Sequence, residues 1–193
     1  MEYRSAAARD AKAIAGLHAD SWRRSYRGAY SDAFLDGDVL SDRLAVWTDR
    51  LTDQCEQRFT IVAESAGVVV GFAHTVHDDD PTWGALVDNL HVAHAQKRRG
   101  VGGRLMAETA RAVLERTASA GLYLWVLEQN KTAQAFYAAL GATCVGREVA
   151  LPPGGDPSRL SGAPVKLRYA WAEPAELLAR LNVPPRAVPE SSA

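Results

Sequence analysis

The sequence contains little cysteine, no long hydrophobic run and almost no net charge. Its 193 residues include two cysteines, Cys55 and Cys144, which lie far apart. Neither belongs to a CxxC motif or has a closely spaced histidine partner, so we expect reduced thiols and no metal site. No stretch of about 18 uninterrupted apolar residues occurs, and the N-terminus has no apolar signal core. We therefore expect a cytoplasmic protein with no membrane partner.

Positive and negative charges nearly balance, with 22 Lys and Arg against 23 Asp and Glu and a formal net charge of −1. A net charge this small would not attract the whole protein to nucleic acid, so no nucleic-acid partner is expected. The composition is that of a globular protein, with enough length for one core. We expect a single domain over residues 1–172. Residues 173–193 are expected to add a short helix, from Pro174 to Leu181, and a disordered tail.

Apolar spacing predicts helices in the first fifty residues. One should begin near Asp10, and a second should cover residues 41–51 with Leu44, Trp47 and Leu51 facing inward.

An aromatic series accompanies the first helix. Trp22, Tyr26 and Tyr30 follow one another at a spacing of four, so their rings would share one side if the helix continued. Gly28 indicates a break before Tyr30.

Strands dominate the rest of the chain. The sequence predicts strands over residues 2–6, 58–64, 68–77, 86–92, 122–127, 143–149 and 165–171, with helices over residues 101–117 and 133–140. Residues 78–81 and 152–155 are expected to be loops, and Cys144 is expected to pack in the core. The predicted inward stripe of the first of these helices comprises Val101, Leu105, Met106, Ala110, Val113, Leu114 and Thr117. This order of elements indicates a mixed α/β (α+β) fold.

The strand over residues 86–92 places an acid on an apolar face. Strict alternation puts Leu86, Asp88, Leu90 and Val92 on one side. The other side would carry Val87, Asn89 and His91.

A basic, glycine-rich loop precedes the helix at residue 101. Lys97, Arg98 and Arg99 are followed by Gly100, Gly102 and Gly103. A helix N-terminus exposes unpaired N–H groups, glycines admit a bulky anion, and the three cations neutralise it, which suits a pyrophosphate. The loop is neither a Walker motif nor a dinucleotide fingerprint, because Arg104 and Leu105 stand where those motifs need other residues. A basic turn that merely caps the helix is the alternative.

Two motifs together resemble the GNAT superfamily of acyl-CoA-dependent N-acetyltransferases. Residues 97–102, Lys-Arg-Arg-Gly-Val-Gly, are similar to its Arg/Gln-x-x-Gly-x-Gly/Ala signature, with lysine in the first position. Residues 130–142 are similar to its Asn-x-x-Ala-x-x-Phe-Tyr-x-x-Leu-Gly-Phe pattern, with Ala142 in place of the last phenylalanine. Trp22 and Tyr26 also resemble the Trp-x-x-x-Tyr opening of many bacterial members. The resemblance is strongest over residues 59–146.

The resemblance implies a mostly antiparallel, twisted sheet of about seven strands flanked by helices, with the fourth and fifth strands splayed around acetyl-CoA. It implies that an acetyl group passes to an amine of a small molecule or peptide by direct attack, without a cysteine nucleophile. Tyr137 would be the general acid for the leaving thiolate. The implied cofactor contacts are Leu90, His91, Val92, Lys97, Arg98, Arg99, Gly100, Val101, Gly102, Gly103, Asn130, Ala133, Phe136 and Tyr137.

The general base and the acceptor are less sharply indicated. Some members carry a glutamate on the fourth strand where this chain has Leu86, so Asp88 is the candidate base, with His74 and His77 as alternatives. His18 and His91 are interpreted as surface or packing residues. In the family the first helices help to form the acceptor pocket, so Trp22, Tyr26 and Tyr30 are candidate substrate contacts. A non-catalytic acyl-CoA sensor of the same fold is the alternative function, and the choice between monomer and homodimer stays open.

Overall fold

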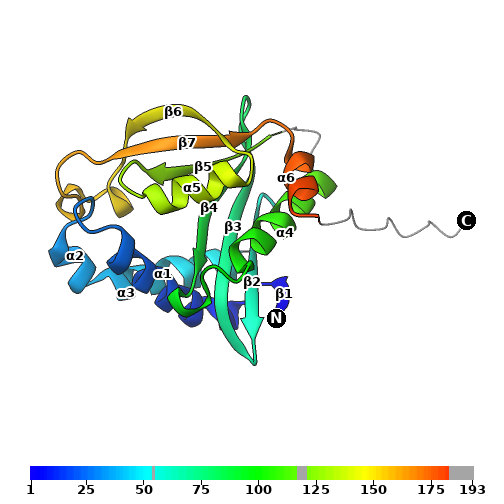
Figure 1. The fold of residues 1–193 in the computed structure, drawn as a ribbon. Helices are drawn as coiled ribbons and strands as arrows, with labels where there is room; N and C mark the ends of the chain where they lie inside the picture. The colour runs from blue at the N-terminus through cyan, green and yellow to red at the C-terminus, as the bar shows by residue number, and fades with distance from the viewer. Residues whose placement is uncertain (54, 117–120, 183–193) are drawn as a thin grey trace, which may run out of the picture.

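One seven-stranded sheet organises the molecule. The structure is a computed structural model that describes residues 1–53, 55–116 and 121–182. The strand order is β1-β2-β3-β4-β5-β7-β6 (Figure 1), and every neighbouring pair is antiparallel except β4 and β5, which are parallel. The strands are β1 Glu2–Ser5, β2 Arg58–Ser65, β3 Val68–Asp80, β4 Gly84–Val92, β5 Leu122–Leu127, β6 Thr143–Val149 and β7 Val165–Trp171. The expected mixed, mostly antiparallel sheet is confirmed.

Helices cover both faces of this sheet. They are α1 Ala11–Ser25, α2 Asp32–Asp36, α3 Val39–Thr52, α4 Val101–Arg116, α5 Lys131–Ala139 and α6 Pro174–Arg180. Short 3-10 turns are η1 Ala8–Asp10, η2 His94–Gln96, η3 Pro153–Gly155 and η4 Pro157–Arg159. The predicted helices and strands are all found, with ends that differ by a few residues.

The secondary structure differs from the sequence-based expectations at three places. The first helix ends at Ser25, so Tyr26 lies outside it, and Tyr30 lies beyond the break that Gly28 indicated. The short helix α2 was not predicted; the Ser31 side chain caps it by accepting a hydrogen bond from the Phe34 N–H. Residues 78–80, expected to be a loop, continue β3 as far as a pairing of Asp80 with Gly84.

The first helices pack on one face of the sheet. Ile14 of α1, Trp47 of α3 and Phe72 of β3 are fully buried together, with the Trp47 and Phe72 ring centroids 5.0 Å apart. Burying such side chains stabilises the fold by about 1.5–3 kcal/mol each. Leu44 was expected to face inward but is 38% exposed, because α3 turns that side away from the sheet.

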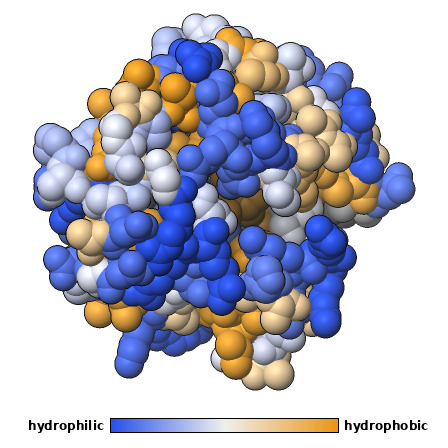
Figure 2. Space-filling model, turned by 60° about the vertical axis from the view of Figure 1, so that its left-hand side comes forward, coloured by the Kyte–Doolittle hydropathy of each residue, from blue (hydrophilic) through white to orange (hydrophobic). Residues whose placement is uncertain are grey.

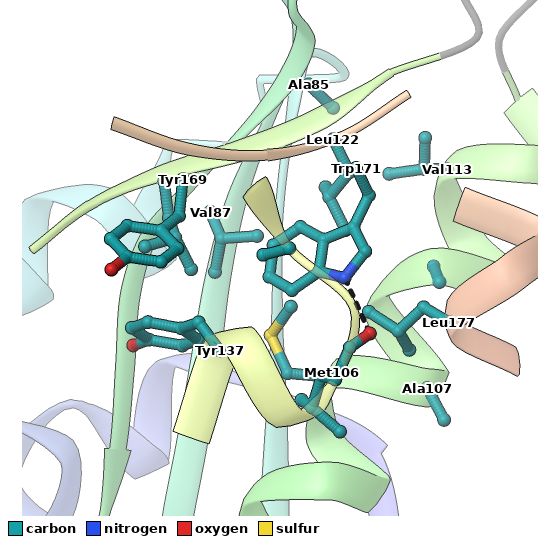
Figure 3. Close-up of a cluster of buried hydrophobic side chains, with 14 of the residues drawn as sticks. Ala85, Val87, Met106, Ala107, Val113, Leu122, Tyr137, Tyr169, Trp171 and Leu177 are labelled. Carbon is teal, nitrogen blue, oxygen red and sulfur yellow. Dashed lines mark hydrogen bonds between the residues drawn. The ribbon is translucent and has the colours of Figure 1, made fainter. Parts of the chain in front are cut away.

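The second core lies on the opposite face, between the sheet and α4, α5 and α6. Met106 and Leu177 are fully buried there beside Trp171, whose indole N–H donates to the Leu140 carbonyl at 2.9 Å (Figure 3). Leu114 was predicted to join this core but is 43% exposed, so the buried stripe of α4 is narrower than predicted. Thr117 lies outside the described residues.

The helix of the expected C-terminal extension is part of this core. Leu177 is fully buried and Leu178 is 7% exposed, and α6 packs along α4. The predicted disordered tail, residues 183–193, lies outside the described residues.

The structure also bears on the expected burial of Cys144 and on membrane-spanning helices. Cys144 was expected in the core but is exposed, because β6 is an edge strand with little packed over it. Within the described ranges, no helix is both long enough and apolar enough to cross a bilayer.

The packing of α6 against α4 leads to a prediction about the free energy of unfolding. Leu177→Ala should lower the free energy of unfolding by about 2–5 kcal/mol, because it leaves a cavity in the second core. Leu114→Ala, on the exposed side of α4, is the matched control and should cost less than about 1 kcal/mol. Urea denaturation followed by circular dichroism measures both. Equal losses of unfolding free energy in the two variants would mean that Leu177 of α6 contributes no more to stability than an exposed residue.

Candidate functional site

The parallel strands β4 and β5 separate after a short contact. Their pairing comprises Ala85 with Leu122, Leu86 with Tyr123, and Val87 with Leu124. Beyond Val87, β4 stays paired with β3 on its other side, and β5 stays paired with β7 through Leu127. The facing edges of the two strands are therefore without strand partners, as expected for splayed fourth and fifth strands.

Two amides of β4 point into the gap. The Ala93 N–H donates to the Val70 carbonyl of β3 at 2.8 Å. Backbone N–H groups alternate sides along a regular strand, and residues 89–92 pair with β3 without irregularity. The N–H groups of Leu90 and Val92 therefore point away from β3, toward β5.

A β-bulge sits where the two strands part. Asn89 pairs with His74 and Val87 pairs with Thr75, so Asp88 has no partner on β3. The bulge interrupts the alternation of side chains, as bulges do beside functional sites. Val87 and Leu90 both pack toward α4, whereas Asp88 contacts Arg50 of α3 on the other face. The prediction that Asp88 shares a face with Leu90 was wrong.

The glycine-rich loop forms the N-terminus of α4. The Gly100 carbonyl accepts from the Arg104 N–H at 3.0 Å, so the N–H groups of residues 101–103 precede the first intrahelical bond. Arg98 and Gly100 both have positive φ, at 61° and 81°. This conformation turns the chain sharply into the helix. Lys97, Arg98 and Arg99 are exposed, and none forms an ion pair within the described part of the chain.

The second motif lies directly beside this loop. A Cβ added at Gly102 would lie 3.3 Å from the Phe136 ring, so glycine lets α5 approach the start of α4. Asn130 caps α5 by accepting from the Ala133 N–H at 3.1 Å, as predicted. The structure thus brings the two sequence motifs together, although 26 residues separate residue 103 from residue 130.

Tyr137 of α5 is buried, and burial raises the pKa of its hydroxyl, which interacts in addition with Tyr26. Among the described residues no side chain or backbone group hydrogen-bonds to this hydroxyl. Figure 3 shows it pointing away from the indole of Trp171. A neutral phenol with an unused proton is suited to donate to a developing anion.

The aromatic series gathers at the C-terminal end of α1. Trp22 stacks on Tyr26 at 5.5 Å and meets Tyr30 edge-on at 4.9 Å between ring centroids. Although the helix ends at Ser25, the turn that follows folds Tyr30 back onto the same cluster, where Phe34 joins it. Burial and the nearby Asp88 carboxylate raise the pKa of Tyr26 to about 12.

Two arginines enclose this cluster. The Arg43 guanidinium lies 4.4 Å from the Trp22 ring centroid, and the Arg159 guanidinium lies 4.7 Å from that of Phe34. Both bind the carboxylate of Asp42. Arg159 belongs to the loop after β6, which is tied to the turn after α1 by the Ser31 N–H donating to the Arg159 carbonyl at 2.9 Å.

Asp88 is not a free carboxylate. It accepts from Arg50 Nη1 at 2.7 Å and from Asn89 Nδ2 at 2.6 Å, and its side chain remains 33% exposed. Sequence reasoning missed Arg50, because nothing distinguishes it from the other charged residues of α3.

Four of the five histidines are buried. His91 shares a 2.8 Å hydrogen bond with Ser21, and its ring lies 4.4 Å from that of His18. His74 shares a 2.8 Å hydrogen bond with Thr60, and His77 stacks on Phe59 at 4.8 Å. Burial lowers the pKa of all four. No group of three or more metal-ligating side chains occurs within residues 1–53, 55–116 and 121–182.

The side toward which β4 and β5 diverge is hollowed. Figure 2 shows a depression near the centre of this face, with hydrophobic atoms at its floor and hydrophilic residues around it. An extended ligand could enter between the two strands from this side.

Comparisons with known proteins agree with this geometry. The chain matches the acetyltransferase (GNAT) family over residues 19–142. It is 30% identical to a "probable N-acetyltransferase" of Mycobacterium tuberculosis over 140 residues, which cover 71% of this chain and 76% of that protein. An uncharacterized N-acetyltransferase of Bacillus subtilis, YuaI, is 26% identical over 66% of this chain and 72% of its own. The crystal structure of PaiA N-acetyltransferase from Thermoplasma acidophilum with coenzyme A is similar at a TM-score of 0.67 and 16% identity, over 88% of this chain and 98% of that one.

The buried histidines predict a loss of stability in mild acid. Burial, with repulsion from Arg50, lowers the pKa of His74 to about 4, and burial, with repulsion from Lys97, lowers that of His91 to about 3. In the unfolded chain both histidines take up protons near pH 6.5, so the unfolded state binds more protons below that value. The free energy of unfolding should therefore fall as the pH drops from 6.5 toward 4, by up to about 1.4 kcal/mol per pH unit for each such histidine.

Urea denaturation between pH 6.5 and 5 measures this slope above the range in which ordinary carboxylates titrate. His91→Asn, which retains a partner for Ser21, should make the slope shallower. A flat profile in the unchanged protein would contradict the neutral, buried state of these rings.

Proposed function

This chain belongs to the acetyltransferase (GNAT) family, and from that premise we propose that it transfers the acetyl group of acetyl-CoA to an amine of a small molecule or peptide. The observation that carries the proposal is the gap between β4 and β5. It presents the N–H groups of Leu90 and Val92 next to the unpaired N-terminus of α4. The free thiols of Cys55 and Cys144 support a reducing, cytoplasmic location.

The pyrophosphate of the cofactor would bind at the start of α4. Three N–H groups, at Val101, Gly102 and Gly103, converge there with the positive end of the helix dipole. The exposed side chains of residues 97–99 would neutralise the phosphates. The pantetheine arm would then extend between the strands, along Leu90 and Val92 on one side and past Asn130, Ala133 and Phe136 on the other.

Acetyl transfer would proceed by direct attack in a ternary complex. The amine lone pair forms the new N–C bond at the thioester carbonyl, and the carbonyl oxygen gains negative charge, which the Leu90 N–H would stabilise. The C–S bond then breaks with its electron pair on sulfur, and Tyr137 would give that sulfur its proton. The proton lost by the amine passes to the base and then through solvent to the Tyr137 phenolate, so atoms and charge balance.

Asp88 is the group we propose for removing the amine proton, directly or through a water molecule. It lies at the mouth of the gap and is partly exposed. His74 is less suited, because it is 2% exposed and an amine cannot reach its ring. Trp22, Tyr26 and Tyr30 would form the wall of the acceptor site on the same side as Asp88.

A thiol-release assay with acetyl-CoA and a broad panel of amines tests the proposed activity. We expect amine-dependent release well above hydrolysis. Tight binding of acetyl-CoA with no amine-dependent release would instead identify a non-catalytic acyl-CoA sensor.

Removing the Tyr137 hydroxyl should slow turnover without weakening cofactor binding. Tyr137→Phe should lower kcat by about a hundredfold or more, because the thiolate loses its proton donor. The Kd for coenzyme A, measured by calorimetry, should stay within about twofold. Tyr3→Phe, on the edge strand β1, is the control and should keep full turnover. Full turnover in Tyr137→Phe would remove this residue from the mechanism.

A charge placed at Gly100 should abolish cofactor binding. Gly100→Glu puts bulk and a negative charge beside the proposed pyrophosphate position. Gly67→Glu is a matched control, because Gly67 and Gly100 have φ of 77° and 81° and an added Cβ meets nothing within 4 Å at either position. Calorimetry with coenzyme A should show binding to the Gly67 variant and none to the Gly100 variant. Equal affinities would place the phosphates elsewhere.

A further inference from the structure

Asp88 lies close to the position proposed for the reacting carbon. It is the first residue of β4 beyond the last pairing with β5, and it precedes Leu90 by two residues. Two residues of a strand span about 7 Å, so the Asp88 side chain can reach an amine that attacks a carbonyl held at Leu90. The group that binds Asp88 in the structure therefore indicates which chemical groups the acceptor has to replace or match.

A guanidinium occupies that position in the structure. Arg50 Nη1 lies 2.7 Å from Asp88 Oδ2, with the two side chains 25% and 33% exposed. The Arg50 guanidinium also lies 5.2 Å from the Trp47 ring centroid, which holds it at this place on α3. A negative and a positive group thus stand side by side, both accessible, at the mouth of the gap.

The aromatic wall adjoins the same two charges. After burial, which is the larger cause, the Asp88 carboxylate contributes to the raised pKa of both Tyr26 and Tyr30. The His18 ring lies 4.5 Å from that of Trp22 and 5.9 Å from that of Trp47, over which Arg50 lies, so ring contacts connect the aromatic cluster with the ion pair. An acceptor in this site would have its reactive end between Asp88 and Arg50 and its remaining part against Tyr26 and Tyr30.

The charge balance disfavours a polycationic acceptor. Asp88 is paired with Arg50, and Asp42 is shared by Arg43 and Arg159, the two arginines that lie over the rings of Trp22 and Phe34. A polyamine would bring two or more ammonium groups to carboxylates that already have arginine partners. A simple monoamine that displaced Arg50 would leave the guanidinium without its counter-ion.

We propose that the acceptor is an α-amino acid, which exchanges partners with the ion pair between Asp88 and Arg50. This inference rests on the proposed acetyltransferase function. The α-amino group takes the place of Arg50 at Asp88, and the α-carboxylate takes the place of Asp88 at Arg50. Each charge gives up one partner and gains another, and the planar guanidinium suits a carboxylate in a two-point contact. Partly exposed ion pairs contribute little to stability, so separating this one costs little.

The reaction balances with the same groups. The α-nitrogen gains the acetyl group, coenzyme A leaves as the free thiol, and one proton is released from the α-ammonium. The side chain of the amino acid would lie against Tyr26 and Tyr30.

The test compares amino acids with their carboxamides. The L-amino acids and their matched amides, including L-phenylalanine, L-phenylalaninamide and phenethylamine, are assayed by thiol release with saturating acetyl-CoA. The amides carry the same amine and side chain without the negative charge. At least one amino acid should be acetylated with a kcat/KM about tenfold or more above that of its amide. Arg50→Met, which retains an unbranched chain over Trp47, should raise the KM for that amino acid about ten- to a hundredfold. The KM for the amide should not rise, because the amide places no carboxylate at Arg50 and its amine no longer has to displace the guanidinium from Asp88. The Kd for acetyl-CoA should stay unchanged.

Arg24→Met is the control, because Arg24 forms an exposed ion pair with Asp20 on α1 and should leave every parameter unchanged. Amides or simple amines that react as well as the amino acids would overturn the inference. So would an Arg50→Met variant with an unchanged KM, or binding of acetyl-CoA without turnover of any amino acid. If other amines react, these results contradict only the amino-acid proposal and not the acetyltransferase function. A protein that does not bind acetyl-CoA would contradict both proposals.

Discussion

The candidate site depends on one constraint: strands β4 and β5 pair over only a short contact. Three residue pairs join the two strands, and beyond Val87 each strand is hydrogen-bonded only to its outer neighbour. Unpaired backbone N–H and C=O groups are costly unless water or a ligand satisfies them. Two facing strand edges at the centre of a sheet would therefore suit an extended molecule that carries its own amides, as proposed for acetyl-CoA. The α4 N-terminus, Tyr137 and Asp88 all lie beside this gap.

The two faces of the sheet hold different parts of the site. On one face, α4 and α5 meet where Gly102 lies against Phe136, which brings the proposed phosphate site and Tyr137 to the same edge of the gap. On the other face, α1 and α3 carry the aromatic cluster and Arg50. Asp42 links this cluster to the loop after β6 by binding Arg43 and Arg159 together. A cofactor and an acceptor entering from opposite faces would meet only where the strands part.

Much of the fold could be predicted from periodicity, and much of the proposed cofactor site from two short motifs. The alternation of residues 86–92 and the helical stripe that begins at Val101 each reflect local geometry that a single segment dictates. The errors came from tertiary structure. The bulge at Asp88 depends on a register shift against β3, which no pattern within β4 reveals. Leu44 and Leu114 satisfy helical spacing but lie on helix sides that the described elements leave partly exposed.

The acceptor side was the least predictable part for the same reason. Its residues come from the end of α1, from α3 and from a loop more than a hundred residues later, and they meet only through contacts such as that of Arg159 with Asp42. Arg50 carries no motif, and its pairing with a carboxylate on β4 can be seen only in three dimensions. Tyr30 lies beyond the break that Gly28 indicated, and only the turn at residues 26–29 brings it back to Trp22.

Amide hydrogen exchange at Leu90 and Val92 tests the central claim most directly. Site-resolved exchange rates would be compared in the free protein and with saturating acetyl-CoA. If the cofactor pairs with the open edge of β4, exchange at both amides should slow on binding, together with that of residues 101–103. If acetyl-CoA binds and exchange at Leu90 and Val92 stays unchanged, the ligand lies elsewhere and this account of the gap is wrong.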